Sequence, residues 1–394
     1  PEVCFCDIIK LQIGCGGERL MFYTLMNMGR EIVRFRTYRN EYGTVRADDV
    51  KVLQQDLLPQ EYTGDVIRFI EGRKAPKHRK HVQSILKQLG AEDVEGFIRV
   101  SSAASLTDTF WVRDEEAPKT WEEVSLYRND FDENIARIAF EGGSGTLSTT
   151  TPELSVDGNY AKCWIKEDQG LFLLKRGSET YGREVFAEYY ASQLAEAICN
   201  ESVIYDLVQH HGHLATKCGI FTSEAKGFSP MMYHVENPHS VSVKEALAII
   251  EKYGDGDNFR RMMVFDALTL NIDRHLGNFG LLMENESLTP LGMAPVFDHN
   301  RSMLFNLSDE RFMAQDMDGL IDIYPRLMGE FNLNANDMLT DEIISDLRNL
   351  SGFQFSRHGR FDWPEERLRK FEHFIDRQID KILNREKLFI SRFE

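Results

Sequence analysis

The amino-acid sequence predicts an α+β protein, with a sheet-rich N-terminal lobe followed by a mostly helical C-terminal lobe. Three observations support this fold class. The 394 residues suffice for more than one domain, strand-like alternation prevails before residue 230, and helical periodicity prevails beyond residue 240. We therefore expect lobes over residues 21–230 and 231–394, and within the first lobe helices near 61–100 and a further sheet from residue 140 onward.

The individual elements follow from local patterns along the chain. Residues 31–45 (EIVRFRTYRNEYGTV) alternate and contain Tyr-Gly, which predicts short strands around a turn. Residues 61–100 are helix-like, with one apolar face formed by Val82, Ile85, Leu86 and Leu89. Two strands, AKCWIKED and GLFLLKRG, flank a turn at 168–170. A helix, REVFAEYYASQLAEAI, and one more strand, HLATKCGIFTSE, follow them.

The charge balance limits the classes of partner. Lys and Arg total 46 against 63 Asp and Glu, and the net charge of −17 argues against direct nucleic-acid binding over the whole surface. One basic stretch, RKAPKHRKH, stands out in this acidic chain. We interpret it as a solvated helix face, with contact to an acidic partner or a nucleic-acid-bound substrate as the alternative; its basic residues are Arg73, Lys74, Lys77, Arg79 and Lys80.

The cysteines and the absence of a signal pattern favour the cytoplasm. Six cysteines are few for this length, so we expect reduced thiols rather than disulfides. The group Cys4, Cys6 and Cys15 lacks the paired spacing of a zinc site, and we interpret the His-rich segment 210–213 as a loop. No apolar run approaches the ~20 residues of a membrane span. Residues 1–20 are a leader whose status the sequence leaves open, and Met21 or Met26 is an alternative start.

The strongest chemical motif is the segment NIDRHLGNFG, residues 271–280. Asp273 and Asn278 have the D-x₄-N spacing of a kinase catalytic loop, in which Asp orients the acceptor hydroxyl and Asn binds a metal ion. Asp273 leaves a helical pattern, enters a polar turn with Arg274 and His275, and precedes the apolar segment FGLLM. This context favours a catalytic role for Asp273.

The D-x₄-N spacing alone is not decisive, because a chain of this composition contains it by chance. Asp266 and Asn271 share the same spacing, but they belong to the apolar helical segment RRMMVFDALTL and its end. For that pair a structural role is the better interpretation.

A second carboxylate follows the short apolar run in APVFDHNRSM. Asp298, emerging from a buried strand, is suited to hold Mg²⁺ against phosphate groups. The alternative is a turn or helix-cap aspartate, which is the common role of Asp in such a segment.

A lysine on a predicted strand supplies the cation that phosphates require. Lys175, in FLLKRG, alternates with apolar residues and can point inward, although a solvated lysine is the alternative. Its carboxylate partner should lie on the following helix, where Glu184 and Glu188 are four residues apart on one face. We favour Glu188.

The segment 141–162, EGGSGTLSTTTPELSVDGNYAK, is rich in glycine and hydroxyl residues. Such a composition suits a loop whose backbone N–H groups contact phosphates. It is not a Walker A motif, because no Gly-Lys-Ser/Thr follows, and an ordinary surface loop is the alternative.

Together these segments resemble the HipA-like serine/threonine kinases. NIDRHLGNFG resembles their N-x-D-R-H-x-x-N catalytic signature, APVFDHNRSM their metal-binding strand end, and SVDGNYAK their S-x-x-G-x-x-x-K phosphate loop. The segments SLTDTFWVRDEE and TWEEVSLYRNDFDENIARIAFEG are similar to a region of the stand-alone bacterial proteins of this type. The resemblance extends over residues 65–385.

This resemblance implies a two-lobed protein-kinase-like fold, with ATP and Mg²⁺ as cofactors and a serine or threonine of a protein as the acceptor. The catalytic residues it implies are Asp273, His275 and Asn278, and the metal ligands are Asn278 and Asp298. The nucleotide-binding residues are Lys175, Glu188, Ser155, Gly158, Lys162 and, at the adenine hinge in CGIFTSE, Phe221 and Thr222. Ser155 also corresponds to a self-phosphorylation site.

The resemblance leaves the acceptor open. The loop lacks the Gln found between Gly and Lys in relatives of the founding toxin, so the chemistry of this loop and of Ser155 departs from the pattern. A toxin-like role with an antitoxin-like protein partner is one expectation. A small-molecule or lipid kinase on the same scaffold, or a nucleotide-binding pseudokinase, are the alternatives. The phosphorylated substrate and the oligomeric state do not follow from the sequence.

Overall fold

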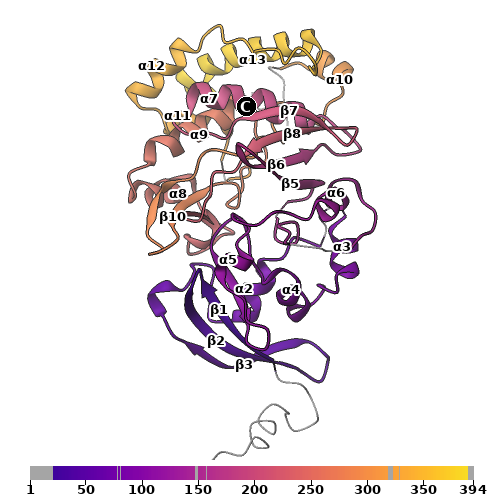
Figure 1. Cartoon of the computed structure of the whole chain (residues 1–394). Coiled ribbons are helices and arrows are strands. Elements are labelled where there is room, and N and C mark those ends of the chain that lie inside the picture. The colour runs from indigo at the N-terminus through magenta and orange to yellow at the C-terminus, as the bar shows by residue number, and fades with distance from the viewer. Residues whose placement is uncertain are drawn as a thin grey trace, which may run out of the picture. The chain divides into compact units, whose positions relative to one another are not determined.

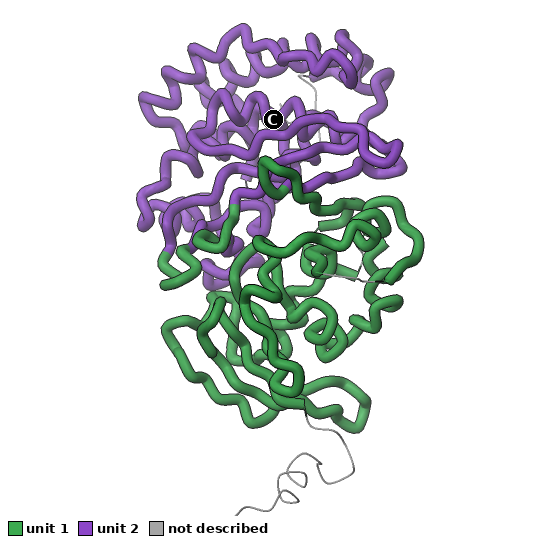
Figure 2. Tube along the Cα trace, viewed as in Figure 1, with its two compact units in different colours: residues 1–171, 222–227, 284–289 green, residues 172–221, 228–283, 290–394 purple. Residues whose placement is uncertain are grey.

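The computed structural model describes residues 21–77, 79, 81–146, 150–156, 158–317, 323–327 and 329–388. The chain divides into two compact units, coloured separately in Figure 2. Unit 1 comprises residues 1–171, 222–227 and 284–289, and unit 2 comprises residues 172–221, 228–283 and 290–394. The predicted lobes, 21–230 and 231–394, divide the chain by expected function and stay a prediction. Residues 1–20, with Cys4, Cys6 and Cys15, lie outside the described residues.

Unit 1 contains a four-stranded antiparallel sheet in the order β3-β2-β1-β4 (Figure 1). Its strands are β1 (Met21–Asn27), β2 (Arg30–Arg39), β3 (Val45–Val52) and β4 (Phe110–Asp114). The turn between β2 and β3 forms because Asn40 Oδ1 accepts hydrogen bonds from the backbone N–H groups of Tyr42 and Thr44. The strands and turn predicted around residues 31–45 are thus confirmed.

Short helices pack against this sheet and complete unit 1. They are η1 (Gln55–Leu57), α2 (Val66–Gly72), α3 (Val82–Gln88), α4 (Val94–Ser101), α5 (Trp121–Val124) and α6 (Glu133–Glu141); β5 (Lys162–Glu167) follows them. Aspartates begin α2, α4 and α6, each accepting a first-turn backbone N–H: Asp65, Asp93 and Asp132. On α3 the predicted apolar face is buried at Val82, Ile85 and Leu86.

The basic stretch after α2 corrects one interpretation. Arg73 pairs with Asp108 at 2.8 Å, and Arg79 pairs with Glu153 at 2.8 Å with both side chains fully buried. A solvated helix face is therefore wrong for these two arginines. Burial of each guanidinium is offset by a carboxylate and backbone carbonyls that accept from it, although the buried Nε of Arg79 has no acceptor. Lys80, from the same stretch, lies outside the described residues.

Unit 2 begins with antiparallel strands paired in the order β6-β8-β7. A long helix contacts β7 and β8. These are β6 (Gly170–Arg176), β7 (Tyr205–His210), β8 (His213–Gly219) and α7 (Glu184–Ile198). The His-rich segment 210–213 forms the hairpin turn between β7 and β8, which agrees with the loop predicted there. The register places Lys175 on β6 opposite Thr216 on β8.

The rest of unit 2 is mostly helical, as predicted (Figure 1). Its buried apolar side chains form one core. Its elements are β9 (Lys226–Pro230), η2 (Met231–Tyr233), α8 (Val243–Glu251), α9 (Gly256–Thr269), β10 (Gly280–Glu284), β11 (Pro290–Met293), α10 (Asp309–Ala314), α11 (Phe331–Asp337), α12 (Asp341–Asn349) and α13 (Glu365–Leu383). Helix α9 is buried along almost its whole length. Among the helices of the described ranges, none combines the length and apolarity needed to cross a membrane.

The small sheet β11-β10-β9 requires a glycine at its start. A Cβ atom at Gly280 would lie 2.2 Å from the carbonyl oxygen of Ser229, so any larger residue would push β9 and β10 apart. Gly280 ends the segment NIDRHLGNFG, so this close approach fixes where the polar turn gives way to the strand β10.

Candidate active site

The centre of the site is the buried side chain of Lys175 on β6. Its Nζ lies 2.5 Å from Oε1 of Glu188 on α7 and 3.0 Å from Oδ1 of Asp298. Burial disfavours the ammonium, but the carboxylates of Asp298 and Glu188 outweigh it and raise the pKa of Lys175 well above its usual value. Lys175 is therefore held as a cation, and a solvated surface lysine is not what the structure contains.

Glu188 is fixed through both of its oxygens. While Oε1 accepts from Lys175, Oε2 accepts a 2.7 Å hydrogen bond from the hydroxyl of Thr216 on β8. The other candidate on the same helix, Glu184, accepts instead from the backbone N–H of Ser178. Of the two carboxylates four residues apart, Glu188 is the one that contacts Lys175, which is the pairing that the sequence favoured.

Asp298 reaches Lys175 from a strained backbone position. Its φ is +58°, in the left-handed region that residues other than glycine rarely adopt. Its backbone N–H donates a 3.1 Å hydrogen bond to the hydroxyl oxygen of the buried Tyr205. Strain of this kind persists only where surrounding contacts impose it and is concentrated at functional sites.

The turn that carries Asp273 and Asn278 is fixed by its own side chains. Asn271 Oδ1 accepts from the N–H of Asp273, and Asn278 Nδ2 donates to the carbonyl of Asp273 at 3.0 Å. The backbone adds bonds from His275 N–H to the Asp273 carbonyl and from Asn278 N–H to the His275 carbonyl. Asp266 accepts from Asn271 Nδ2, which supports the structural role assigned to that pair. The two predicted site residues are thereby held at a constant separation.

Arg274 connects this turn to the segment that bears Asp298. It is fully buried, pairs with Asp266 at 3.0 Å, and donates from Nη1 to the carbonyl of Asn278 at 2.9 Å and that of Phe297 at 2.5 Å. Although burial opposes its charge, Asp266 raises the pKa of Arg274. The sequence shows Arg274 only as a neighbour of Asp273, because its partners Asp266 and Phe297 lie outside the turn.

The carboxylate of Asp273 is partly accessible and has a cation beside it. Its side chain is 26% exposed, and Arg301 Nε lies 3.5 Å from Oδ2. Burial raises the pKa of Asp273, the charges of Arg301 and His275 oppose this, and nearby Asp298 adds to it. Arg301 was not singled out from the sequence, because nothing local relates it to Asp273.

The histidines of the two motifs have different surroundings. His275 Nδ1 accepts from the N–H of Gly277 at 3.0 Å, so this nitrogen stabilises the turn; the predicted catalytic role of His275 stays a prediction. His299 is completely buried, and burial together with Arg274 lowers its pKa well below the usual value. His299 is therefore a neutral side chain packed against Phe265 and Tyr205.

The predicted adenine hinge divides between the two units. Phe221, in unit 2, packs its half-buried ring against Phe228 and Phe297 at centroid distances of 5.7 and 5.4 Å. Thr222, in unit 1, donates its hydroxyl to the carbonyl of Leu106 at 2.5 Å. Three partly buried rings form an apolar surface of the kind on which a purine stacks.

The predicted phosphate loop belongs to unit 1. Gly158 has φ +97°, a conformation that residues with a side chain rarely adopt, and the Nζ of Lys162 lies 2.3 Å from where a Cβ of residue 158 would be. The hydroxyl of Ser155 donates to the carbonyl of Pro152 at 3.2 Å. Asp157 lies outside the described residues. Gly158 and Lys162 are thus close together within unit 1. Within unit 2, direct contacts join Lys175 to Glu188 and Asp298, and Asn278 to Asp273. Arg274 links the two groups through the carbonyls of Asn278 and Phe297.

The thiols and metal-ligating residues show no second site in the described part of the chain. Cys163, Cys199 and Cys218 are buried thiols that are not part of a disulfide. Within the described ranges no three His, Cys, Asp or Glu side chains are grouped to hold a metal ion. The predicted Mg²⁺ ligands, Asn278 and Asp298, are an amide and one carboxylate, a set that would need phosphate or water oxygens to complete it.

Comparison with solved structures specifies this α+β fold further. No protein-family model matches the sequence, and no curated protein sequence is significantly similar to it. The HipA structure from Shewanella oneidensis MR-1, solved as a complex of the toxin–antitoxin system HipA, HipB and operator DNA, is 12% identical with a TM-score of 0.52. The match covers 92% of this chain and 97% of that one. The chain therefore has the HipA-like fold that the sequence predicted.

A second similar structure is the Helicobacter pylori proinflammatory kinase CtkA. It is 16% identical, with a TM-score of 0.42, and the match covers 59% of this chain and 89% of that one.

Proposed function

We propose that this chain is an ATP- and Mg²⁺-dependent serine/threonine protein kinase of the HipA-like type. The observation that carries the proposal is the position of Lys175, a buried cation between Glu188 and Asp298 within a HipA-like fold. A buried lysine with a helix carboxylate on one side and a loop carboxylate on the other can exchange the loop contact for phosphate oxygens. A purely stabilising role does not explain this group, because removing the lysine and two carboxylates from water costs free energy.

The residues present fit a magnesium ion. Asn278 uses its Nδ2 to donate to the carbonyl of Asp273, which directs its amide oxygen away as an acceptor. Together with Asp298 this gives the oxygen ligands that Mg²⁺ prefers, while Lys175 would bind phosphate oxygens directly. When bound, Mg²⁺ would neutralise charge that develops on the phosphates.

Asp273 would act on the acceptor hydroxyl. The hydroxyl oxygen attacks the γ-phosphorus, the bond from that phosphorus to the bridging oxygen of ADP breaks, and the hydroxyl proton passes to the Asp273 carboxylate. The partial exposure of Asp273 supports this role, since an acceptor must reach it. Arg301 lowers the pKa of Asp273 and so favours its ionised form, although burial leaves that pKa above its usual value.

The resemblance to HipA-like kinases also suggests an acceptor and a partner for this chain. We place the activity in the cytoplasm, with Ser155 as a self-phosphorylation site. The HipA structure with the shared fold is described with HipB, so we propose an antitoxin-like protein as a partner of this chain in a toxin-like role. Phe221 and Thr222 would flank the adenine.

Incubation with ATP and Mg²⁺, followed by intact-mass measurement, tests the proposal. We expect wild-type protein to gain the mass of a phosphoryl group and Asp273→Asn protein to gain none. ATP binding without transfer would favour a pseudokinase. Transfer only to added lipids or small molecules would favour the other kinase classes, and either result would contradict protein kinase activity.

A further inference from the structure

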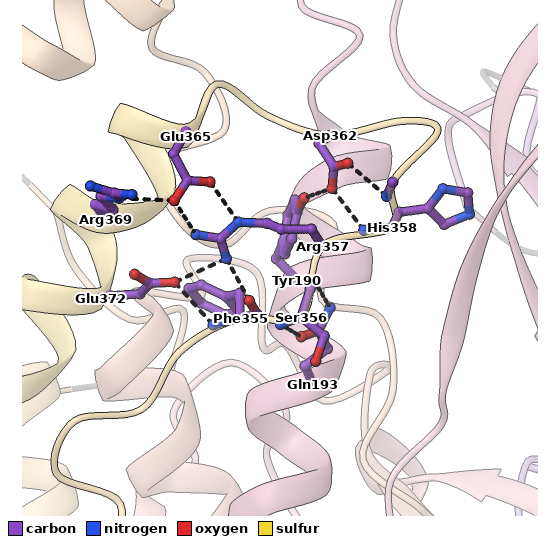
Figure 3. A network of polar contacts seen from close by, with 11 residues as sticks. Tyr190, Gln193, Phe355, Ser356, Arg357, His358, Asp362, Glu365, Arg369 and Glu372 are labelled. Atoms are coloured by element: carbon purple, nitrogen blue, oxygen red, sulfur yellow. Dashed lines mark hydrogen bonds and ion pairs between the residues drawn. The ribbon is translucent and has the colours of Figure 1, made fainter.

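Helix α7, which carries Glu188, is bonded to an irregular segment near the C-terminus. Residues 352–363, here called the strap, lie between α12 and α13 and form neither helix nor strand (Figure 3). We propose that the strap sets the rotation of α7, so that Tyr190 and Asp362 are positioning residues for the Lys175–Glu188 pair. The inference rests on the proposed function of that pair.

Hydrogen bonds join the strap to α7 at two places. The side chain of Gln193 bonds both backbone groups of Ser356, accepting from its N–H at 2.7 Å and donating to its carbonyl at 3.1 Å. The hydroxyl of Tyr190 donates to Asp362 Oδ1. Figure 3 shows both contacts on one side of the helix. A two-point attachment resists both sliding and rotation of α7.

Aromatic packing fills the space between these bonds. The ring of Tyr190 stacks on Trp363 at a centroid distance of 5.7 Å and meets Phe355 edge-on at 5.4 Å. Phe186 stacks on the same Trp363 at 5.9 Å, and Tyr189 meets His358 edge-on. Because Tyr190 is fully buried, a change in the rotation of α7 would open a void beneath these rings.

The strap is itself anchored to α13. Arg357 forms a paired contact with Glu365 at 2.8 and 3.0 Å and a further bond to Glu372 at 3.0 Å (Figure 3). Asp362 accepts from the backbone N–H groups of His358 and Gly359, which closes the end of the strap. The strap therefore presents a preformed surface to α7 rather than a flexible one.

Helical geometry makes this surface relevant to Glu188. Phe186, Tyr190 and Gln193 share one face, whereas Glu188 follows Phe186 by two residues, about 200° further around the helix. The strap and Lys175 thus contact opposite faces of α7. Any rotation of α7 that breaks the strap contacts therefore moves the Glu188 carboxylate away from the Lys175 ammonium. Their present N–O distance is 2.5 Å, so a small displacement weakens the pair.

A stabilising role alone would also explain the contacts, so the test must separate the two. We would measure kcat and the KM for ATP of Tyr190→Phe, which removes only the hydroxyl, and Asp362→Asn, each alone and combined with Glu188→Gln. Asp337→Asn is the matched control, because Asp337 pairs with Arg385 at 2.7 Å away from the strap.

If the strap acts through Glu188, each strap variant lowers kcat/KM for ATP about tenfold, but less than about twofold in the Glu188→Gln background. The control should leave kcat/KM unchanged in both backgrounds. Equal losses in both backgrounds, or no loss with either strap variant, would overturn the inference while wild-type turnover upholds the proposed function. Absence of turnover in the wild type would overturn both.

Discussion

Arg301 Nε lies 3.5 Å from Oδ2 of Asp273, so the candidate catalytic carboxylate has a permanent cation as its neighbour. Burial pushes the pKa of Asp273 upward, and Arg301 is the largest influence in the opposite direction. A general base works only when it is ionised. The ion pair therefore lowers the pH at which Asp273 becomes ionised, relative to the same carboxyl group without Arg301.

This relationship predicts a shift in the pH profile. Replacing Arg301 with Gln removes the charge that lowers the pKa of Asp273, so that pKa rises. Because kcat/KM increases as the base loses its proton, the acidic limb of the profile should move to higher pH. Arg301→Lys retains the charge and should leave the limb nearly in place. An unmoved limb in Arg301→Gln would mean that the profile reports another group.

Asp273→Asn keeps the side-chain shape and removes the proton acceptor. Phosphoryl transfer should fall at least about a hundredfold, the lower scale for such a group, while ATP binding persists. Turnover and ATP binding are measured on the same preparation. Asp168→Asn, in the exposed turn after β5, is the control and should be fully active. If Asp273 only stabilises its turn, Asn would serve equally well and activity would survive.

Asp298→Asn and Asn278→Ala should abolish Mg²⁺-dependent turnover and leave the thermal melt close to that of wild type. Asn is the appropriate replacement for Asp298, because Asn tolerates the φ of +58° better than most residues. The loss then comes from the missing charge and not from backbone strain. Turnover measured across a Mg²⁺ titration decides the matter, and near-normal turnover in either variant would place the metal elsewhere.

The site residues differ in how far the sequence could predict them. The turn from Asp273 to Asn278 was predictable because its spacing is local, and so was a carboxylate partner for Lys175 one helix away. The contacts of Arg274 were not predictable, because one of its partners is the carbonyl of Phe297 in a separate segment. The spacing of residues within one segment does not predict which backbone groups from remote segments will contact that segment.

The same limit applies to the fold. The α+β class and the order of strands and helices followed from periodicity, and the HipA-like fold agrees with them. Arg79 belongs to a charged, helix-like stretch, and charge on such a stretch usually faces water. Its partner Glu153 is remote in sequence, and only the tertiary structure brings the two together.

Ser155 is the predicted site of self-phosphorylation. Its hydroxyl now donates to the carbonyl of Pro152, and a phosphate there would add about −1.5 to −2 charge to a loop expected to face the ATP phosphates. We expect modification to repel nucleotide and lower turnover. Phosphopeptide mapping after ATP incubation tests this, with Ser155→Ala as the control that should stay unmodified. Label confined to residues 149–151, or outside 141–162, would contradict the assignment.

The buried Arg79–Glu153 pair should contribute strongly to the stability of unit 1. Arg79 donates to the Glu153 carboxylate and to the carbonyls of Glu153 and Lys162, all buried. Arg79→Met leaves the carboxylate without its counter-charge, so the free energy of unfolding should fall by about 3–5 kcal/mol. Arg34→Met, which breaks the exposed pair with Glu31, is the control and should cost at most about 1 kcal/mol.

The double variant Arg79→Met, Glu153→Leu separates the buried charge from the lost hydrogen bonds. Removing both charged groups should recover part of the stability lost in Arg79→Met, since no isolated charge remains. Recovery should be incomplete, because the carbonyls of Glu153 and Lys162 would still lack the donor that Arg79 supplied. Urea unfolding of the three variants measures these differences. Full recovery would show that the carbonyl bonds contribute nothing, and a double variant less stable than Arg79→Met would contradict the charge argument.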